Sequence, residues 1–100
     1  MKVAVIGDPD FTLGFRLVGI RDVYEVKNDE ELVEAVRNVL DRKDVGVVVI
    51  KYEDLRKLPP VLRREIDERV EPTFVAVGGV GAVEELRDKI RRALGVDLWK

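Results

Sequence analysis

Two aspartates, Asp8 and Asp10, follow the first apolar run of the chain, residues 3–6, and are its first candidates for chemistry. An acidic pair after a buried strand can hold Mg²⁺ while a phosphoryl group is transferred to an aspartate at the end of a later strand. The third apolar run of this chain ends at Lys51 and Tyr52, so the nucleophilic aspartate is missing. These residue types argue against a phosphoryl-accepting domain.

The same two aspartates have two further interpretations, a divalent metal site and a helix cap. Calcium takes about six to eight oxygen ligands, so two carboxylates on one loop are too few without several other oxygens. Aspartate is also a preferred residue at helix N-termini and in turns. We favour the structural role, in which the aspartates cap the first helix and brace the turn, and expect neither a metal nor a cofactor.

A glycine-rich turn, Gly79-Val80-Gly81, follows the last apolar run and precedes a helical pattern. Backbone amides in that context can bind a phosphate. However, Glu84 stands where a G-x-G-x-x-G motif needs its third glycine, and the acidic pair Glu84-Glu85 would repel an anion. The pattern favours a tight turn between a strand and a helix over a nucleotide site.

The composition excludes several classes of site and partner. The chain has no cysteine and no histidine, which removes thiolate metal sites and the commonest general base. Charged residues make up 38% of the chain with a net charge of −2 and interspersed signs, so we expect no nucleic-acid binding. No apolar run approaches the ~20 residues that cross a bilayer, so we expect no direct membrane insertion. The many Glu, Lys, Arg and Val residues, with no Ser or Gln, are typical of a thermophile.

Four runs rich in β-branched residues predict strands, at residues 2–6, 22–26, 45–50 and 73–77. The second run is less apolar and alternates, which predicts an edge strand. Between the second and third runs, Asn28 and Glu31 have the spacing of a capping box. The helix that follows carries one apolar face: Leu32, Ala35, Val36, Val39 and Leu40.

Two more helices are predicted later in the chain. One begins at Pro59 and Pro60 and is expected to bury Leu62, Ile66 and Val70. The other spans residues 83–94 and ends at Gly95, with an apolar stripe of Val83, Leu86, Ile90 and Leu94. This stripe can pack on the domain's own sheet or lie in a groove of a partner.

The alternation of strands and helices predicts an α/β fold with a parallel sheet. We expect residues 1–100 to form a single small doubly wound domain, flavodoxin- or receiver-like, with four strands in the order 2-1-3-4. Residues 83–100 are expected to form a C-terminal helix and tail that can change position.

Phe15, Arg16 and Leu17 lie where the first helix is expected to end. Aromatic residues and arginine are favoured anchors at protein interfaces. A core position for Phe15 and a solvated Arg16 fit the sequence equally well, so both interpretations stay open.

The chain resembles the small F-type stalk protein of archaeal A-type and vacuolar-type rotary ATPases over nearly its whole length. The most specific part is residues 14–20, Gly-Phe-Arg-Leu-Val-Gly-Ile, where the family has Gly-Phe-Arg-Leu-Ala-Gly-Ile. The opening residues 2–10, the strand at residues 44–50 and the ending Ala93-Leu94-Gly95-Val96-Asp97 are also similar to the family.

The resemblance implies a non-catalytic component of the central stalk, the rotor, which is not an enzyme by itself. Such a component binds the coiled-coil D subunit and couples ATP synthesis or hydrolysis to ion translocation. It would lie at the cytoplasmic face of the cell membrane, held there only through the complex. The expected partner-binding residues are Phe15, Arg16, Leu17, Leu86, Ile90 and Leu94, and the C-terminal helix is expected to reach the catalytic A and B ring.

Two alternatives remain at this stage. One is a free-standing small-ligand or nucleotide-binding α/β domain that uses the Asp8 and Gly79 loops. The other is a generic adaptor that binds through its edge strand, whose binding would not depend on Arg16.

Overall fold

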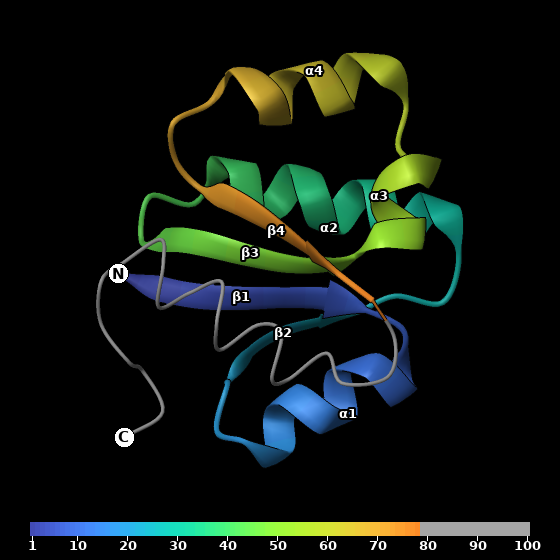
Figure 1. Ribbon diagram of the computed structural model, residues 1–100, viewed down its shortest axis with the longest axis vertical. Helices are drawn as coiled ribbons and strands as arrows, with labels where there is room; N and C mark the ends of the chain where they lie inside the picture. The colour runs from blue at the N-terminus through green and yellow to red at the C-terminus, as the bar shows by residue number, and fades with distance from the viewer. Residues whose placement is uncertain (79–100) are drawn as a thin grey trace.

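The structure is a computed structural model of the chain, and it describes residues 1–78. Strands and helices alternate along this part of the chain (Figure 1). In chain order the elements are β1 (Lys2–Gly7), α1 (Pro9–Leu17), β2 (Asp22–Glu25), α2 (Asp29–Asp41), β3 (Val45–Lys51), α3 (Tyr52–Lys57), α4 (Pro60–Glu68) and β4 (Thr73–Val77).

The four strands form one parallel sheet in the order β2-β1-β3-β4, which confirms the predicted topology. In the register, Val5 of β1 pairs with Val23 of β2 on one side and with Val49 of β3 on the other. The two central strands are buried on both faces, as their unbroken apolar sequences predict. The less apolar β2 lies at the sheet edge, also as predicted.

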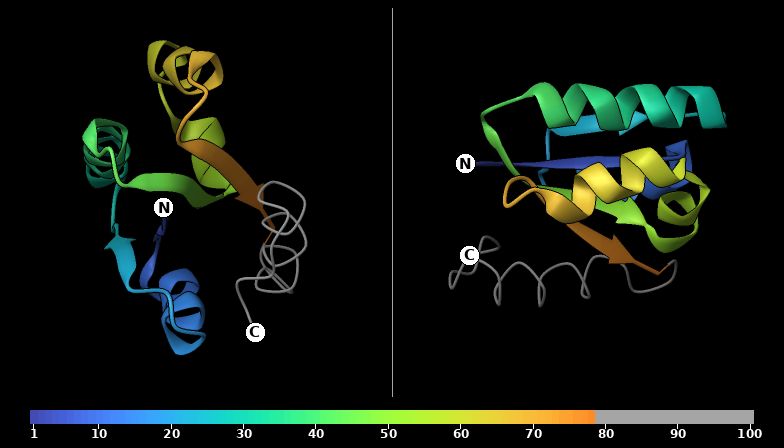
Figure 2. Two further views of the ribbon diagram at one scale, coloured as in Figure 1. Left: turned by 90° about the vertical axis from the view of Figure 1, so that its left-hand side faces the viewer. Right: turned by 90° about the horizontal axis from the view of Figure 1, so that it is seen from above.

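Within residues 1–78, α2 and α4 cover one face of the sheet and α1 covers the other (Figures 1 and 2). The larger core lies on the α2 and α4 side, where Ile6, Val48 and Ile50 meet the apolar face of α2. All five apolar residues predicted for that helix face are buried. The core on the α1 side is smaller and is centred on Val5, Phe15 and Val49.

The predicted capping box holds the start of α2. The Asn28 side chain accepts a hydrogen bond from the Glu31 N–H at 2.8 Å, and the Glu31 carboxylate accepts one from the Lys27 N–H at 2.8 Å. These contacts fix where the chain enters α2 after leaving the edge strand.

Two details differ from the sequence-based predictions. The six-residue helix α3 was not predicted, because it buries no residue and has no apolar stripe. Val70 is 89% exposed rather than buried, since α4 ends at Glu68, whereas Leu62 and Ile66 are buried as expected. The predicted helix at residues 83–94, with Leu86, Ile90 and Leu94, lies outside the described residues.

Candidate partner-binding site

Asp8 caps helix α1, which confirms its structural interpretation. Its Oδ1 atom accepts a hydrogen bond from the N–H of Phe11 at 2.8 Å, and Pro9 occupies the first helical position. Pro9 has no N–H to satisfy, and the capped N–H is one that the helix itself leaves without a partner.

The second carboxylate oxygen of Asp8 is held by Lys51, from the end of β3. The Lys51 Nζ lies 3.1 Å from Asp8 Oδ2 and 5.8 Å from the centre of the Phe11 ring. The cap and the lysine lower the pKa of Asp8, and the Asp8 carboxylate raises the pKa of Lys51. A cation supplied by the chain itself therefore occupies the side of Asp8 that a metal ion would need.

Asp8 and Lys51 line a crevice of about 270 Å³ at the carboxyl ends of β1 and β3, where open α/β sheets usually bind ligands. Three lysines and four carboxylates line it together, so it offers no surface of a single charge. Burial raises the pKa of Asp54, which lies beside Lys57 at 3.8 Å. Asp10 does not line this crevice, and residues 1–78 contain no group of three or more carboxylates placed to bind a metal.

The two other predicted regions divide at the limit of the described chain. The glycine-rich turn Gly79-Val80-Gly81 lies beyond residue 78, as do Leu86, Ile90 and Leu94. Phe15, Arg16 and Leu17 lie in the last turn of α1, where the sequence places them.

These three neighbours have different surroundings. Phe15 is 1% exposed and packs edge-to-face on Phe11, with ring centres 4.9 Å apart, so its ring belongs to the core. Arg16 is exposed and its guanidinium lies 3.9 Å from the Glu25 carboxylate of β2. Leu17 is 78% exposed and points away from the sheet.

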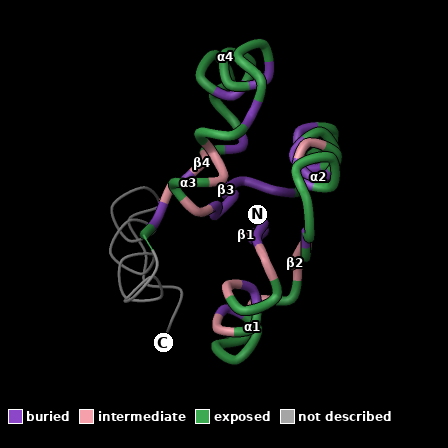
Figure 3. The backbone as a smooth tube through the Cα atoms, turned by 90° about the vertical axis from the view of Figure 1, so that its right-hand side faces the viewer, coloured by how far each residue is buried: buried purple, intermediate pink, exposed green. Residues whose placement is uncertain are grey.

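The outer face of α1 carries an apolar stripe, and Figure 3 shows the exposed and buried sides of this helix. Asp10, Leu13, Gly14 and Leu17 have the i, i+3, i+4, i+7 spacing of one helix face, opposite to the buried Thr12 and Phe15. Leu13 is 53% exposed. We call these four residues the outer stripe of α1.

The two glycines near this stripe are different in kind. Gly19 has φ +101° and ends α1: its N–H donates to the Arg16 carbonyl, while the Ile20 N–H donates to the Phe15 carbonyl. This is a Schellman motif, which needs a glycine at that position. Gly14 is helical, and a Cβ atom there would meet no atom within 4 Å.

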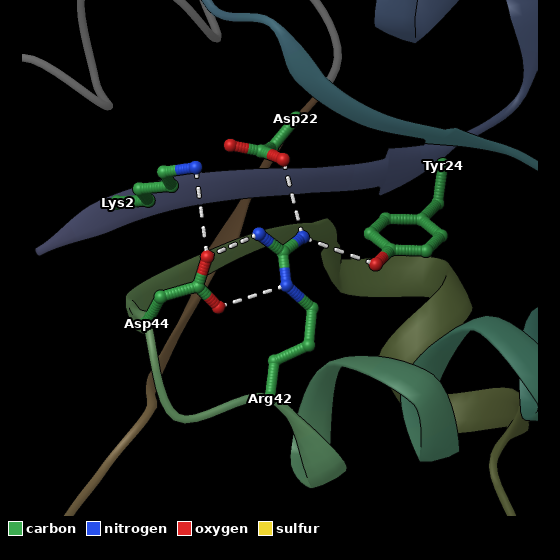
Figure 4. A network of polar contacts seen from close by, with 5 residues as sticks. All are labelled: Lys2, Asp22, Tyr24, Arg42 and Asp44. Atoms are coloured by element: carbon green, nitrogen blue, oxygen red, sulfur yellow. Dashed lines mark hydrogen bonds and ion pairs between the residues drawn. The ribbon is translucent and has the colours of Figure 1, made fainter.

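A polar network that the sequence did not predict holds the edge strand (Figure 4). The Arg42 guanidinium, just after α2, donates to both carboxylate oxygens of Asp44 at 3.0 and 2.7 Å. It also donates to Asp22 at 3.1 Å and to the Tyr24 hydroxyl at 3.2 Å, both on β2, while Lys2 lies 3.6 Å from Asp44. One side chain thus connects β2, the end of α2 and the start of β3.

Comparisons with known proteins agree with the fold and extend along the whole chain. The family model described as ATP synthase (F/14-kDa) subunit matches residues 3–94. Two similar relatives are the F subunits of the A-type ATP synthases of Archaeoglobus fulgidus and Methanocella arvoryzae. The first is 73% identical over 99% of this chain and 98% of the relative, and the second is 49% identical over the full length of both.

A solved structure gives the same answer. The crystal structure of the F subunit of the V-type ATP synthase of Archaeoglobus fulgidus matches with a TM-score of 0.74 and 70% sequence identity, over 77% of this chain and 96% of that one. The resemblance drawn from residues 14–20 is confirmed. The chain belongs to the family of F/14-kDa ATP synthase subunits, which are non-catalytic components of a rotary complex.

Proposed function

We propose that the chain is a central-stalk component of an A-type or V-type ATP synthase and binds a coiled-coil D-type subunit through the outer stripe of α1. The observation that carries the proposal is Gly14. A glycine inside a helix costs roughly 0.5–1 kcal/mol of stability relative to alanine, and no neighbour within the described residues requires its small size.

A helical partner explains that cost. Leu13 and Leu17 present apolar surface on either side of Gly14, and a position without a side chain lets another helix approach the backbone closely. The i, i+3, i+4, i+7 spacing is the arrangement that a helix face presents to another helix. The D-type subunit, a long coiled coil, offers such a helix.

The other expected contacts have separate roles. Arg16 borders the stripe on the β2 side, where its exposed ion pair with Glu25 can be exchanged for a carboxylate of the partner at little cost. Phe15 supports the stripe from inside the core. Leu86, Ile90 and Leu94 are proposed as a second contact region, on the stalk or toward the catalytic A and B ring.

The mechanism we propose is mechanical. A small rigid domain bound to the stalk favours the stalk arrangement that it binds best, and the bias equals the difference between its affinities for the two arrangements. Through the stalk, the protein would take part in coupling ATP synthesis or hydrolysis to ion translocation at the cytoplasmic face of the membrane. No helix within residues 1–78 is long and apolar enough to span a bilayer.

The test is co-purification with the D-type subunit of the same organism. We expect a 1:1 complex that Leu17→Asp weakens at least about tenfold, because a carboxylate replaces a buried apolar contact. Val61→Asp is the matched control, since Val61 is 80% exposed on α4, at the opposite face of the sheet. A complex that both variants weaken equally would refute the α1 site and keep the stalk role. No complex between the two folded proteins would refute both.

The free-standing ligand-binding alternative has its own test. If the Asp8 loop bound a nucleotide with Mg²⁺, the ligand would raise the melting temperature of the isolated chain. We expect no such rise, because the chain's own Lys51 holds Asp8.

A further inference from the structure

The outer edge of β2 is an open hydrogen-bonding edge within the described part of the chain. The sheet order places β2 at one end, with β1 as its single described neighbour. Along a parallel strand, the backbone groups of alternate residues point to opposite sides. The Val26 N–H donates to the Gly7 carbonyl of β1 at 2.8 Å, so the backbone groups of Tyr24 also face β1, and those of Val23 and Glu25 face outward.

Three of these outward groups are open among residues 1–78. The Val23 N–H donates within its own segment, to the Arg21 carbonyl at 3.0 Å. The Val23 carbonyl and both backbone groups of Glu25 remain available. Three groups in this pattern can accept the backbone of one added strand.

A groove of about 320 Å³ runs along this edge, between β2 and α2. Figure 2 shows α2 and α1 on opposite sides of the sheet at this end. Three glutamates and no lysine or arginine are among its eight described lining residues: Val23, Tyr24, Glu25, Val26, Glu31, Glu34, Ala35 and Asn38.

The acids of the groove differ in how far they are already paired. Glu31 accepts the Lys27 N–H, and Glu25 has a long ion pair with Arg16. Glu34 has no hydrogen bond or ion pair between its side chain and any residue of the described chain. A strand lying in the groove would pass this unpaired carboxylate.

We propose that the open edge of β2 binds an extended basic segment of another chain, which adds a fifth strand to the sheet. Its backbone would pair with Val23 and Glu25, and lysine or arginine side chains on its α2 side would reach Glu31 and Glu34. A second copy of this chain is the less suitable occupant, because antiparallel pairing of two β2 edges brings two sets of the same glutamates together. The proposal does not depend on whether α1 binds a stalk protein.

The rigidity of the edge supports this assignment. Arg42 bonds Asp22 and Tyr24 of β2 from the side of α2, so the edge strand is held in place before any partner arrives. A pre-organised edge loses little conformational freedom on binding.

The experiment uses the full-length chain and a labelled acetyl-(Lys-Val)₃-amide peptide as the probe. We expect binding by fluorescence anisotropy, with exchange of the Glu25 amide hydrogen slowed at least about tenfold at saturation. The same peptide with every amide N-methylated keeps the charge and loses the ladder, so it should not bind. An acetyl-(Glu-Val)₃-amide peptide should not bind either.

Matched protein variants test the contribution of charge. Glu34→Lys should raise the Kd for the basic peptide by about fivefold or more, with a smaller effect at high salt. Glu68→Lys makes the same charge change at the end of α4, outside the groove, and should leave the Kd unchanged. The proposal fails if no basic peptide binds up to about 1 mM, a free energy near −4 kcal/mol. It also fails if the N-methylated peptide binds equally well, or if the two variants have equal effects.

Discussion

The Lys51 Nζ lies 3.1 Å from Asp8 Oδ2, so an ion pair joins the carboxyl ends of the two central strands. The same aspartate caps α1 with its other oxygen. One side chain therefore orients the helix that carries the proposed stalk contact and connects it to the centre of the sheet.

Replacing this aspartate separates its two roles. We expect Asp8→Ala to lower the free energy of unfolding by about 1–2 kcal/mol, because a helix cap is lost. Asp8→Asn keeps the cap oxygen and loses the charge, so it should cost clearly less. Urea denaturation of both variants measures the difference, and an equal loss would show that the ion pair, not the cap, carries the stabilisation.

The carboxylate of Asp44 predicts a pH dependence of stability. Hydrogen bonds from Arg42 lower its pKa to about 2, against about 3.9 in an unfolded chain. A lowered pKa in the folded state gives a contribution that is complete above about pH 5 and is lost as the pH falls through the folded-state pKa near 2. Unfolding curves of the natural chain and Asp44→Asn should therefore differ most above pH 5 and converge toward pH 2. A constant gap across this range would contradict the assignment.

Two glycine-to-alanine substitutions should have opposite signs. Gly14→Ala meets open space in a helix and should stabilise the free chain by roughly 0.5–1 kcal/mol, while it weakens binding of the D-type subunit. At Gly7, a Cβ would overlap the ring of Phe11, so Gly7→Ala should destabilise the chain by about 1–3 kcal/mol. Thermal unfolding with and without the D-type subunit measures both effects. If Gly14→Ala stabilises the chain and leaves binding intact, the glycine does not serve a close contact.

Arg42 should control the edge strand specifically. In Arg42→Lys the planar fork that bonds Asp44 through two nitrogens is lost. We expect hydrogen exchange at the Tyr24 and Val26 amides to become about tenfold faster, with little change in α4. Arg37→Lys is the control, because Arg37 is exposed on α2 and its side chain makes no hydrogen bond or ion pair within residues 1–78. Faster exchange throughout the sheet would instead indicate a global loss of stability.

Neighbouring residues of α1 should separate folding from binding. Phe15→Ala removes a ring that is 1% exposed and should cost about 3–5 kcal/mol. Leu17→Ala, at 78% exposure, should change stability by less than about 0.5 kcal/mol. Denaturant unfolding of the two variants tests the assignment. A large destabilisation by Leu17→Ala would mean that this side chain already packs inside the free chain.

Most of the fold could be predicted because it follows from periodicity. The β-branched runs and the five apolar positions from Leu32 to Leu40 define strands and a helix face without long-range information. The limits of that method appear at α3, whose six residues are too few to show a stripe, and at Val70, where the helix ends before the apolar position.

The site was less predictable, since its contacts join distant residues. The cap at Asp8 is local and was foreseen, but its partner Lys51 is 43 residues away. Arg42 and Asp22 are 20 residues apart and meet only once the sheet has formed. The significance of Gly14 likewise depends on the open space around it, which no sequence pattern reports.

The placement of α1 and α4 on opposite faces of the sheet has a practical consequence for optical experiments. The chain has no cysteine, so a single thiol introduced at Glu68 is the only one that a maleimide dye can modify. That dye would lie on the far side of the sheet from the α1 stripe and outside the β2 groove. A fluorophore there could report the orientation of this protein during single-molecule rotation without touching either proposed contact surface.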